Sequence, residues 1–301
     1  MISTARITKT SKTIPDNAVF SILIPSWNNL DYLKNCIESI RKNSSFHHQI
    51  IVHINEGHDG TVEWVSQQND LDYTFSAENI GVCYALNICR GLVATNYIVY
   101  MNDDMYVCPD WDKHLLEEVQ NIGHPYFFLS ATAIEPFPGN NCTLFGDYGN
   151  SLANFNEQKL LEEYASFTKD DWQGATWPPN IVHVSVWDMV GGYSTEFHPG
   201  FYSDPDFSMK LWQAGIRLFK GVNKSRVYHF GSKSTVRLSK DRNYSRFIAK
   251  WGITSSTFTR YYLHRGEKFT GPLPEVKLSW KQVIKNYCKQ ITAQLLIHPQ
   301  K

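Results

Sequence analysis

The sequence predicts an α/β protein. It should have a Rossmann-like, mostly parallel sheet with helices on both faces, followed by a basic helical C-terminal tail. Two observations support this prediction. Strand-like and helix-like stretches alternate from Phe20 onward, which is typical of repeated βα units. Hydrophobic residues also make up 42% of the 301-residue chain, enough for a sizeable core.

The expected elements of the first half follow one another in order. β-branched and aromatic runs predict strands, and apolar residues at helical spacing predict helices. The expected strands cover Phe20–Pro25, Gln49–Ile54, Tyr73–Phe75 and a run from Tyr97, and the helices cover Tyr32–Asn43, a segment from Thr61, and Gly81–Gly91.

The second half is less regular. We expect a strand at Phe127–Ala133, then a Gly-, Asn- and Pro-rich loop over Pro136–Asn150. A helix should follow Asp204 and end at Gly215, because Phe207, Met209, Leu211 and Trp212 give it apolar residues. Further expected elements are short strands at Arg217–Gly221 and Arg226–Phe230, a basic helical region from Lys240 and a final segment at Trp280–Ile297.

Composition suggests three parts: a polar, disordered leader over residues 1–17, an α/β domain over 18–238 and a basic helical extension over 239–301. No apolar run approaches the roughly 20 residues that a membrane-spanning helix needs. The six cysteines show no Cys-x-x-Cys spacing, which argues against a zinc site and favours reduced thiols. We therefore expect a cytoplasmic protein.

The net charge of zero conceals a strong division. Residues 209–301 carry 19 Lys and Arg but 3 Asp and Glu, whereas the first 208 residues carry 10 and 26. Such asymmetry predicts a basic region that faces an anionic partner. Because no nucleic-acid-binding motif is present, nucleic acid is not expected.

Three polar residues follow the apolar run from Tyr97 to Met101: Asn102, Asp103 and Asp104. In open α/β sheets, ligands bind at the carboxyl ends of the strands. Adjacent carboxylates repel each other unless a cation lies between them. Hard oxygen ligands suit Mg²⁺ or Mn²⁺, usually shared with substrate phosphates. A solvated acidic turn is the alternative.

Six short segments occur in a fixed order between Phe20 and Ser234. They are Ile24–Asn28, Asn55–Thr61, Glu78–Gly81, Asn102–Asp104, Tyr202–Phe207 and His229–Ser234. Together they resemble the motifs of the family-2 glycosyltransferases, which have the GT-A fold. The resemblance implies a GT-A-type sheet and transfer of a sugar from a nucleoside-diphosphate sugar. It also implies a saccharide or lipid-linked acceptor and inversion at the sugar carbon.

The resemblance assigns chemistry to particular residues. Asp204 would be the general base, and Asp104, with His229 as a second ligand, would hold Mg²⁺ or Mn²⁺. The purely structural alternatives are helix capping for Asp204 and Asp206, and packing in the protein interior for His229. Being at a helix end should lower the pKa of Asp204.

Further residues are expected to contact the nucleotide or substrate. They are Pro25, Ser26, Asn28, Asn55, Glu56, Asn79, Gly81, Asn102, Asp103, Asp206 and Trp172. The backbone N–H groups near Asn79 and Gly81 precede a helix, a position that favours phosphate. Trp172 belongs to an aromatic stretch that ends at Trp177, so stacking on an acceptor sugar and core packing both remain open.

Three positions depart from the family pattern. Asn102 replaces the first Asp of the Asp-x-Asp motif, Ser203 replaces an acid, and Ile54 stands where an Asp often meets the base. Asn102 and Ser203 leave room for a catalytically silent sugar- or nucleotide-binding protein on the same fold. A sugar-nucleotide nucleotidyltransferase is a second alternative, although residues 26–29 lack the Gly-rich, basic loop of that class.

The tail contains four lysines spaced four residues apart: Lys277, Lys281, Lys285 and Lys289. On a helix they form one stripe, with apolar side chains nearby. Peripheral contact of 277–297 with the anionic inner face of a membrane is one interpretation. The other is a solvated basic face on a helix whose apolar side packs on the catalytic domain.

Overall fold

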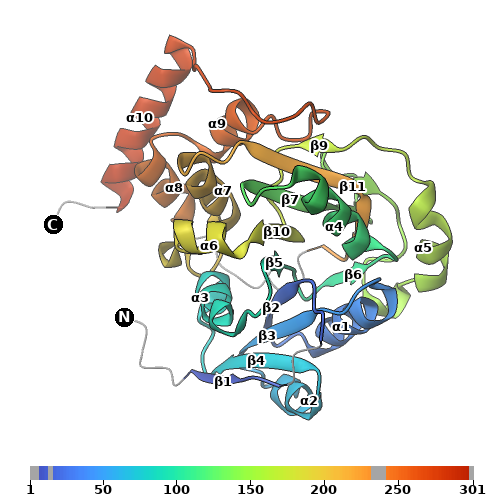
Figure 1. Ribbon diagram of the computed structural model, residues 1–301. Coiled ribbons are helices and arrows are strands. Elements are labelled where there is room, and N and C mark those ends of the chain that lie inside the picture. The colour runs from blue at the N-terminus through green and yellow to red at the C-terminus, as the bar shows by residue number, and fades with distance from the viewer. Residues whose placement is uncertain (1–6, 13–15, 232–241, 298–301) are drawn as a thin grey trace.

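The computed structural model describes residues 7–12, 16–231 and 242–297. Their strands form one mixed sheet in the order β1-β4-β3-β2-β5-β10-β7-β11-β6. Helices cover both faces (Figure 1), as the sequence predicts. This arrangement confirms the α/β fold class.

The first half of the sheet consists of parallel strands joined by helices. The strands are β2 (Ser21–Trp27), β3 (Gln49–Asn55), β4 (Leu71–Ser76) and β5 (Tyr97–Tyr100), and the helices are α1 (Leu30–Asn43), α2 (Thr61–Gln67) and α3 (Gly81–Cys89). Parallel pairing joins β4 to β3, β3 to β2 and β2 to β5. Side chains of α1 and α3 enter two different core clusters, so these helices cover opposite faces. The carboxyl ends of β2, β3 and β5 therefore meet at one edge of the sheet.

The second half mixes strand directions. Its elements are β6 (Met105–Val107), α4 (Trp111–Ile122), β7 (Phe127–Glu135), β8 (Leu144–Phe145), α5 (Glu157–Glu163), β9 (Trp172–Gln173), β10 (Asn180–His183), α6 (Val184–Val190), α7 (Ser203–Gln213) and β11 (Leu218–His229). Strand β10 runs antiparallel between β5 and β7. The sequence did not suggest β6, α4 or β10.

One expected pair of strands is a single element. Arg217–Gly221 and Arg226–Phe230 were expected as separate short strands, but β11 runs through both and pairs with β7. The register shifts between Val222 and Arg226, so an irregularity inside one strand accounts for the polar interruption in the sequence.

The expected leader is partly ordered. Thr8–Thr10 forms β1, which pairs antiparallel with β4. The expectation of disorder is therefore wrong for these residues, while 1–6 and 13–15 lie outside the described residues. All six cysteines are unpaired, and five of them are buried, as expected of small hydrophobic side chains.

The C-terminal region contains α8 (Asn243–Trp251), α9 (Ser255–Thr257), a π-helical turn (Phe258–Tyr262) and α10 (Trp280–Ile297). Phe247, Phe258 and Leu273 belong to the same core cluster as Phe207 and Leu211 of α7. This part of the chain therefore packs into the main body. Among the described residues, no helix is long and apolar enough to cross a bilayer.

Candidate active site

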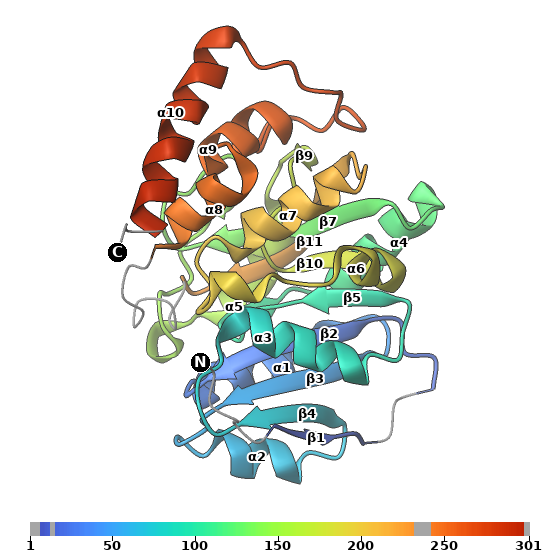
Figure 2. The ribbon, with the colours of Figure 1, turned by 90° about the vertical axis from the view of Figure 1, so that its left-hand side faces the viewer.

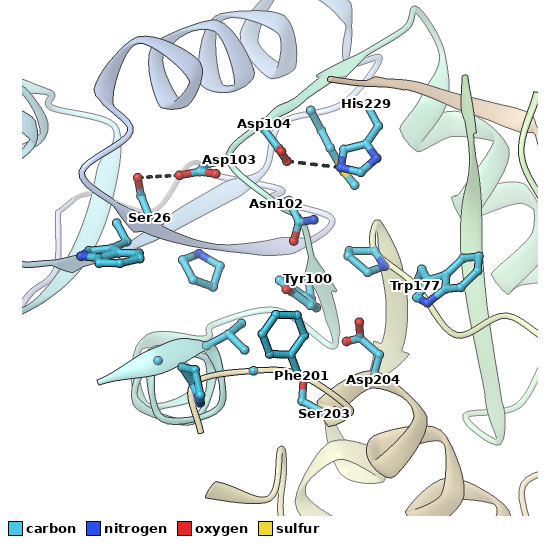
Figure 3. Close-up of a pocket in the computed structure, with 18 of the residues that line it drawn as sticks. Ser26, Tyr100, Asn102, Asp103, Asp104, Trp177, Phe201, Ser203, Asp204 and His229 are labelled. Carbon is cyan, nitrogen blue, oxygen red and sulfur yellow. Dashed lines mark hydrogen bonds and ion pairs between the residues drawn. The ribbon is translucent and has the colours of Figure 1, made fainter. Parts of the chain in front are cut away.

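A cleft of about 540 Å³ lies at the carboxyl edge of the sheet. Ser26 of β2 and Asn102–Asp104, which follow β5, form one wall, and Asp204 at the start of α7 lies on the facing wall (Figure 3). The sequence-predicted residues that line it are Pro25, Ser26, Asn55, Asn79, Gly81, Asn102, Asp103, Asp104, Asp204 and His229. The fold thus brings together residues more than 200 positions apart in the chain.

The acidic pair is almost fully buried at the bottom of the first wall. Asp103 accepts a 2.8 Å hydrogen bond from the Ser26 hydroxyl. The Asp104 carboxylate lies 3.5 Å from Nε2 of His229, and the other ring nitrogen lies 2.8 Å from Glu135. Burial alone would lower the pKa of His229, but the carboxylates of Asp104 and Glu135 outweigh it and raise the pKa to about 10.

On the facing wall, Asp204 occupies the first turn of α7. Burial raises its pKa to about 7, and a 3.4 Å hydrogen bond from the Tyr193 hydroxyl opposes that rise. The expected lowering by the helix end is thus outweighed by desolvation. A carboxyl group with a pKa near neutrality suits proton transfer.

Asp206, two residues further along α7, does not line the cleft. Its buried carboxylate accepts a 2.8 Å hydrogen bond from Trp251 Nε1 and lies 2.9 Å from Lys250 Nζ. It therefore ties α7 to α8. Capping was also expected at this helix start, but Tyr202 holds the N-cap position, with φ at 67° and no side-chain cap.

Asn28 and Glu56 lie beside the cleft and are paired with each other. The Glu56 carboxylate accepts 2.8 Å hydrogen bonds from both Asn28 Nδ2 and Trp27 Nε1. Trp27 does line the cleft, whereas Glu56 borders a neighbouring hollow next to His58. The Asn28–Glu56 pair holds the loop after β2 in place from outside the cleft.

Asn79 and Gly81 form a tight, internally bonded turn. The Gly81 N–H donates to Asn79 Oδ1 at 2.9 Å, so it does not point freely at a phosphate as expected. Gly81 has φ at 73°, and a Cβ there would come within 2.5 Å of His198 Nδ1. Glycine is needed because the 198–199 segment packs against this turn.

The aromatic stretch divides between core and cleft. Trp172 is buried on β9, covers Gly221 and donates to the Thr132 hydroxyl at 2.9 Å. Trp177 lines the cleft (Figure 3). Core packing therefore accounts for Trp172, and the residue available to a sugar is five positions later.

Sequence reasoning missed Glu135, Tyr193 and Phe201. Glu135 ends β7 and touches His229, so a carboxylate just after an expected strand was the available signal. Tyr193 is buried and reaches Asp204 from a loop. Nothing local in the sequence marks it, or Phe201, which lines the cleft.

The cleft fits a divalent metal ion only if the ion shares its ligands between the protein and the substrate phosphates. Within residues 7–12, 16–231 and 242–297, no group of three or more His, Cys, Asp or Glu side chains is arranged to hold a metal ion. Mg²⁺, however, is commonly held by one or two protein ligands together with substrate phosphates. Asp104 fits that smaller set, whereas His229 would have to lose the proton that Asp104 and Glu135 stabilise before its ring nitrogen could join it.

Comparison with known families gives one match. The family model described as glycosyl transferase family 2 matches residues 21–163. This range contains β2 to β5 and the Asn102–Asp104 segment. No curated protein matches the chain in sequence.

Solved structures with the same fold include the TarS protein of S. aureus. Its residues 1–349 align with a TM-score of 0.56 at 10% identity, over 94% of this chain and 73% of that one. The same protein in complex with UDP-GlcNAc gives 0.56 at 11% identity, over 94% and 74%. GalNAc-T7 with UDP, GalNAc and Mn²⁺ gives 0.53 at 13% identity, over 71% and 44%. At these identities the similarity shows the fold alone.

Proposed function

We propose that this glycosyltransferase, whose residues 21–163 belong to glycosyl transferase family 2, moves a sugar from a nucleoside-diphosphate sugar to an acceptor. The proposed acceptor is a saccharide or a lipid-linked molecule, and the configuration of the sugar carbon is inverted. The observation that carries this proposal is the pair of opposed walls. Asp103 and Asp104 lie on one side of a single cleft, and Asp204 lies on the other.

The first wall is proposed to hold the donor. Pro25, Ser26 and Asn55 would line the nucleoside, next to Asn102 and Asp103. Asp104 and His229 would hold Mg²⁺ or Mn²⁺, which neutralises charge that develops on the leaving diphosphate. TarS binds UDP-GlcNAc and GalNAc-T7 binds UDP and Mn²⁺ in the named structures, which supports this assignment.

The second wall is proposed to act on the acceptor. Asp204 would take the proton from the acceptor hydroxyl as its oxygen bonds to the sugar carbon and the bond to the diphosphate breaks. Its raised pKa supports this role, because a base works best when its pKa lies near the working pH. Attack from the face opposite the diphosphate inverts the sugar carbon. Trp177 is placed to stack on a sugar.

A panel of UDP-, GDP- and dTDP-sugars with Mg²⁺ or Mn²⁺ tests the proposal. We expect one donor to raise the melting temperature and to release its nucleoside diphosphate when an acceptor is present. NMR of the product should show the inverted anomer. A product with retained configuration would contradict the displacement, and release of pyrophosphate would indicate nucleotidyl transfer instead.

A lipid-linked acceptor would bring the enzyme to a membrane. The sequence-based expectation of peripheral contact through 277–297 is consistent with such an acceptor.

A further inference from the structure

Helix α10 presents its apolar side to solvent. Trp280, Ile284, Tyr287, Ile291 and Leu295 follow the i, i+4, i+7, i+11, i+15 spacing of one helix face. Their exposed fractions range from 44% for Ile291 to 68% for Trp280. We call these five residues the outer stripe. From Trp280 to Leu295 it runs about 22 Å along the helix.

The opposite side of α10 holds the helix on the protein. Asn286 and Ala293 are buried there, and Asn286 accepts a 3.0 Å hydrogen bond from the Thr257 hydroxyl. The Arg242 guanidinium donates to the Leu296 carbonyl at 3.0 Å. The contacts of α10 with α8 and α9 thus include small and polar residues, while the five side chains of the outer stripe are exposed. Figure 2 shows α10 on the outside of the molecule, beside α8.

This orientation removes one of the two interpretations of the tail. An amphipathic helix that packed its apolar side on the catalytic domain would bury Ile284 and Ile291. In the structure both are exposed. Soluble monomers rarely expose a contiguous apolar stripe, and exposed patches of this kind mark interaction sites.

The charges beside the stripe identify the kind of partner. Lys281 and Lys285 are exposed along one edge of the outer stripe, and Lys277 precedes the helix. No acidic residue follows Glu275 in the sequence. A second copy of α10 would bring lysines against lysines with no carboxylate to pair them. An anionic lipid surface satisfies both the apolar stripe and the lysines.

We propose that α10 docks on an anionic lipid surface, with the outer stripe in the headgroup region and Lys277, Lys281 and Lys285 on the lipid phosphates. Figure 2 shows the C-terminal end of α10 on the side of the molecule where β2, β3 and β4 end. The cleft lies at that same edge of the sheet. Docking would therefore bring the cleft near the lipid.

Co-sedimentation of the full chain with lipid vesicles tests the proposal. Vesicles of phosphatidylcholine alone are compared with an equal mixture of phosphatidylcholine and phosphatidylglycerol. We expect binding to the mixed vesicles, with release at high salt because charge attraction is screened. Absence of binding to the mixed vesicles at low salt would overturn the proposal.

Two double variants locate the contact. Ile284→Ser with Ile291→Ser should abolish binding. Lys281→Gln with Lys285→Gln should weaken it about 25-fold, since each lysine near an anionic surface is worth about a factor of five. All four side chains are exposed, so the melting temperature of both variants should equal that of the wild type.

Matched controls use exposed residues elsewhere. Lys224→Gln removes a lysine of the same basic region, and Met189→Ser removes an exposed apolar side chain of α6. Both should bind like the wild type, and equal loss in these controls would overturn the assignment to α10. A chain that is dimeric, ignores vesicles and becomes monomeric on Ile284→Ser would show that a second copy covers the stripe. Vesicle binding needs no donor or acceptor, so this result is independent of the transfer assay.

Discussion

The two walls of the cleft differ in how their polar groups are satisfied. On the first wall, the acidic and amide side chains bond to one another or to backbone: Ser26 to Asp103, and Asn55 to the Ile80 N–H at 2.9 Å. On the second wall, Asp204 receives a long hydrogen bond from Tyr193 and has a raised pKa. The first wall is held by internal hydrogen bonds, whereas the second is suited to exchanging a proton.

Asp204→Asn is the most severe test of this difference. We expect transfer to fall about 10³- to 10⁴-fold, because a general base contributes up to that factor. Binding of the nucleoside diphosphate should stay within about twofold, since that ligand belongs to the first wall. Steady-state kinetics and calorimetric titration measure the two effects. An equal loss of transfer rate and of nucleoside-diphosphate affinity would mean that Asp204 also takes part in donor binding.

Asp104→Asn tests the other wall. Affinity for the nucleoside diphosphate in Mg²⁺ or Mn²⁺ should fall about 100-fold, because the ion loses a ligand that carries charge. Titrations with and without a chelator measure the loss. If the wild type binds equally well in chelator, Asp104 holds no ion that matters for binding.

Asp206→Asn is the matched control for Asp204, since it lies two residues away on the same helix. It removes the charge that faces Lys250 while keeping an acceptor for Trp251. We expect a loss of about 1–3 kcal/mol in the free energy of unfolding, because a buried polar link is weakened. Denaturant titration measures it. Donor affinity of the folded variant should be unchanged, and a variant with full stability but no transfer would reverse the roles of the two aspartates.

Tyr193→Phe should give the smallest effect. The Tyr193 hydroxyl lowers the pKa of Asp204 against the rise from burial, so its removal should raise that pKa further. The acidic limb of the pH–rate profile, expected near pH 7 for the wild type, should move to higher pH. A downward move would mean that another group controls this limb.

The same pKa affects stability. The pKa of Asp204 rises from 3.8 to about 7 on folding, so the folded state binds the proton more tightly than the unfolded chain. Its contribution is fully present below pH 4 and is lost as the pH rises through 7. Asp204→Asn should remove this slope.

The sequence predicted the first half well, because its information is local. Each βα unit from β2 to β5 carries its own apolar periodicity, and the carboxyl edge of a parallel sheet follows from topology. Topology predicted a ligand site at Asp104, whereas Asp204 and His229 were assigned to the site by the family resemblance. Short strands such as β10 carry too few residues for a periodic signal, and their position depends on partners far along the chain.

Some side-chain roles could not be predicted for a similar reason. Asp204 and Asp206 look alike in sequence, and only the packing of α8 decides that Asp206 faces Trp251. Trp172 and Trp177 differ in the same way, since Gly221 creates the space that Trp172 fills. Burial raises the pKa of Asp204 and outweighs the lowering by the helix end. Burial is a property of the tertiary structure, which local sequence does not reveal.

The antiparallel strand β10 has a consequence for biosynthesis. One edge of β5 pairs with β2, but its other edge pairs with β10, and Tyr100 is bonded in register with Asn180. About 80 residues separate the two, which a ribosome adds in about 4–16 s. During that interval the nascent chain has an open, apolar strand edge, the kind that recruits neighbouring chains. We expect ribosome-bound chains stalled before residue 180 to bind chaperones more strongly than chains stalled after residue 231.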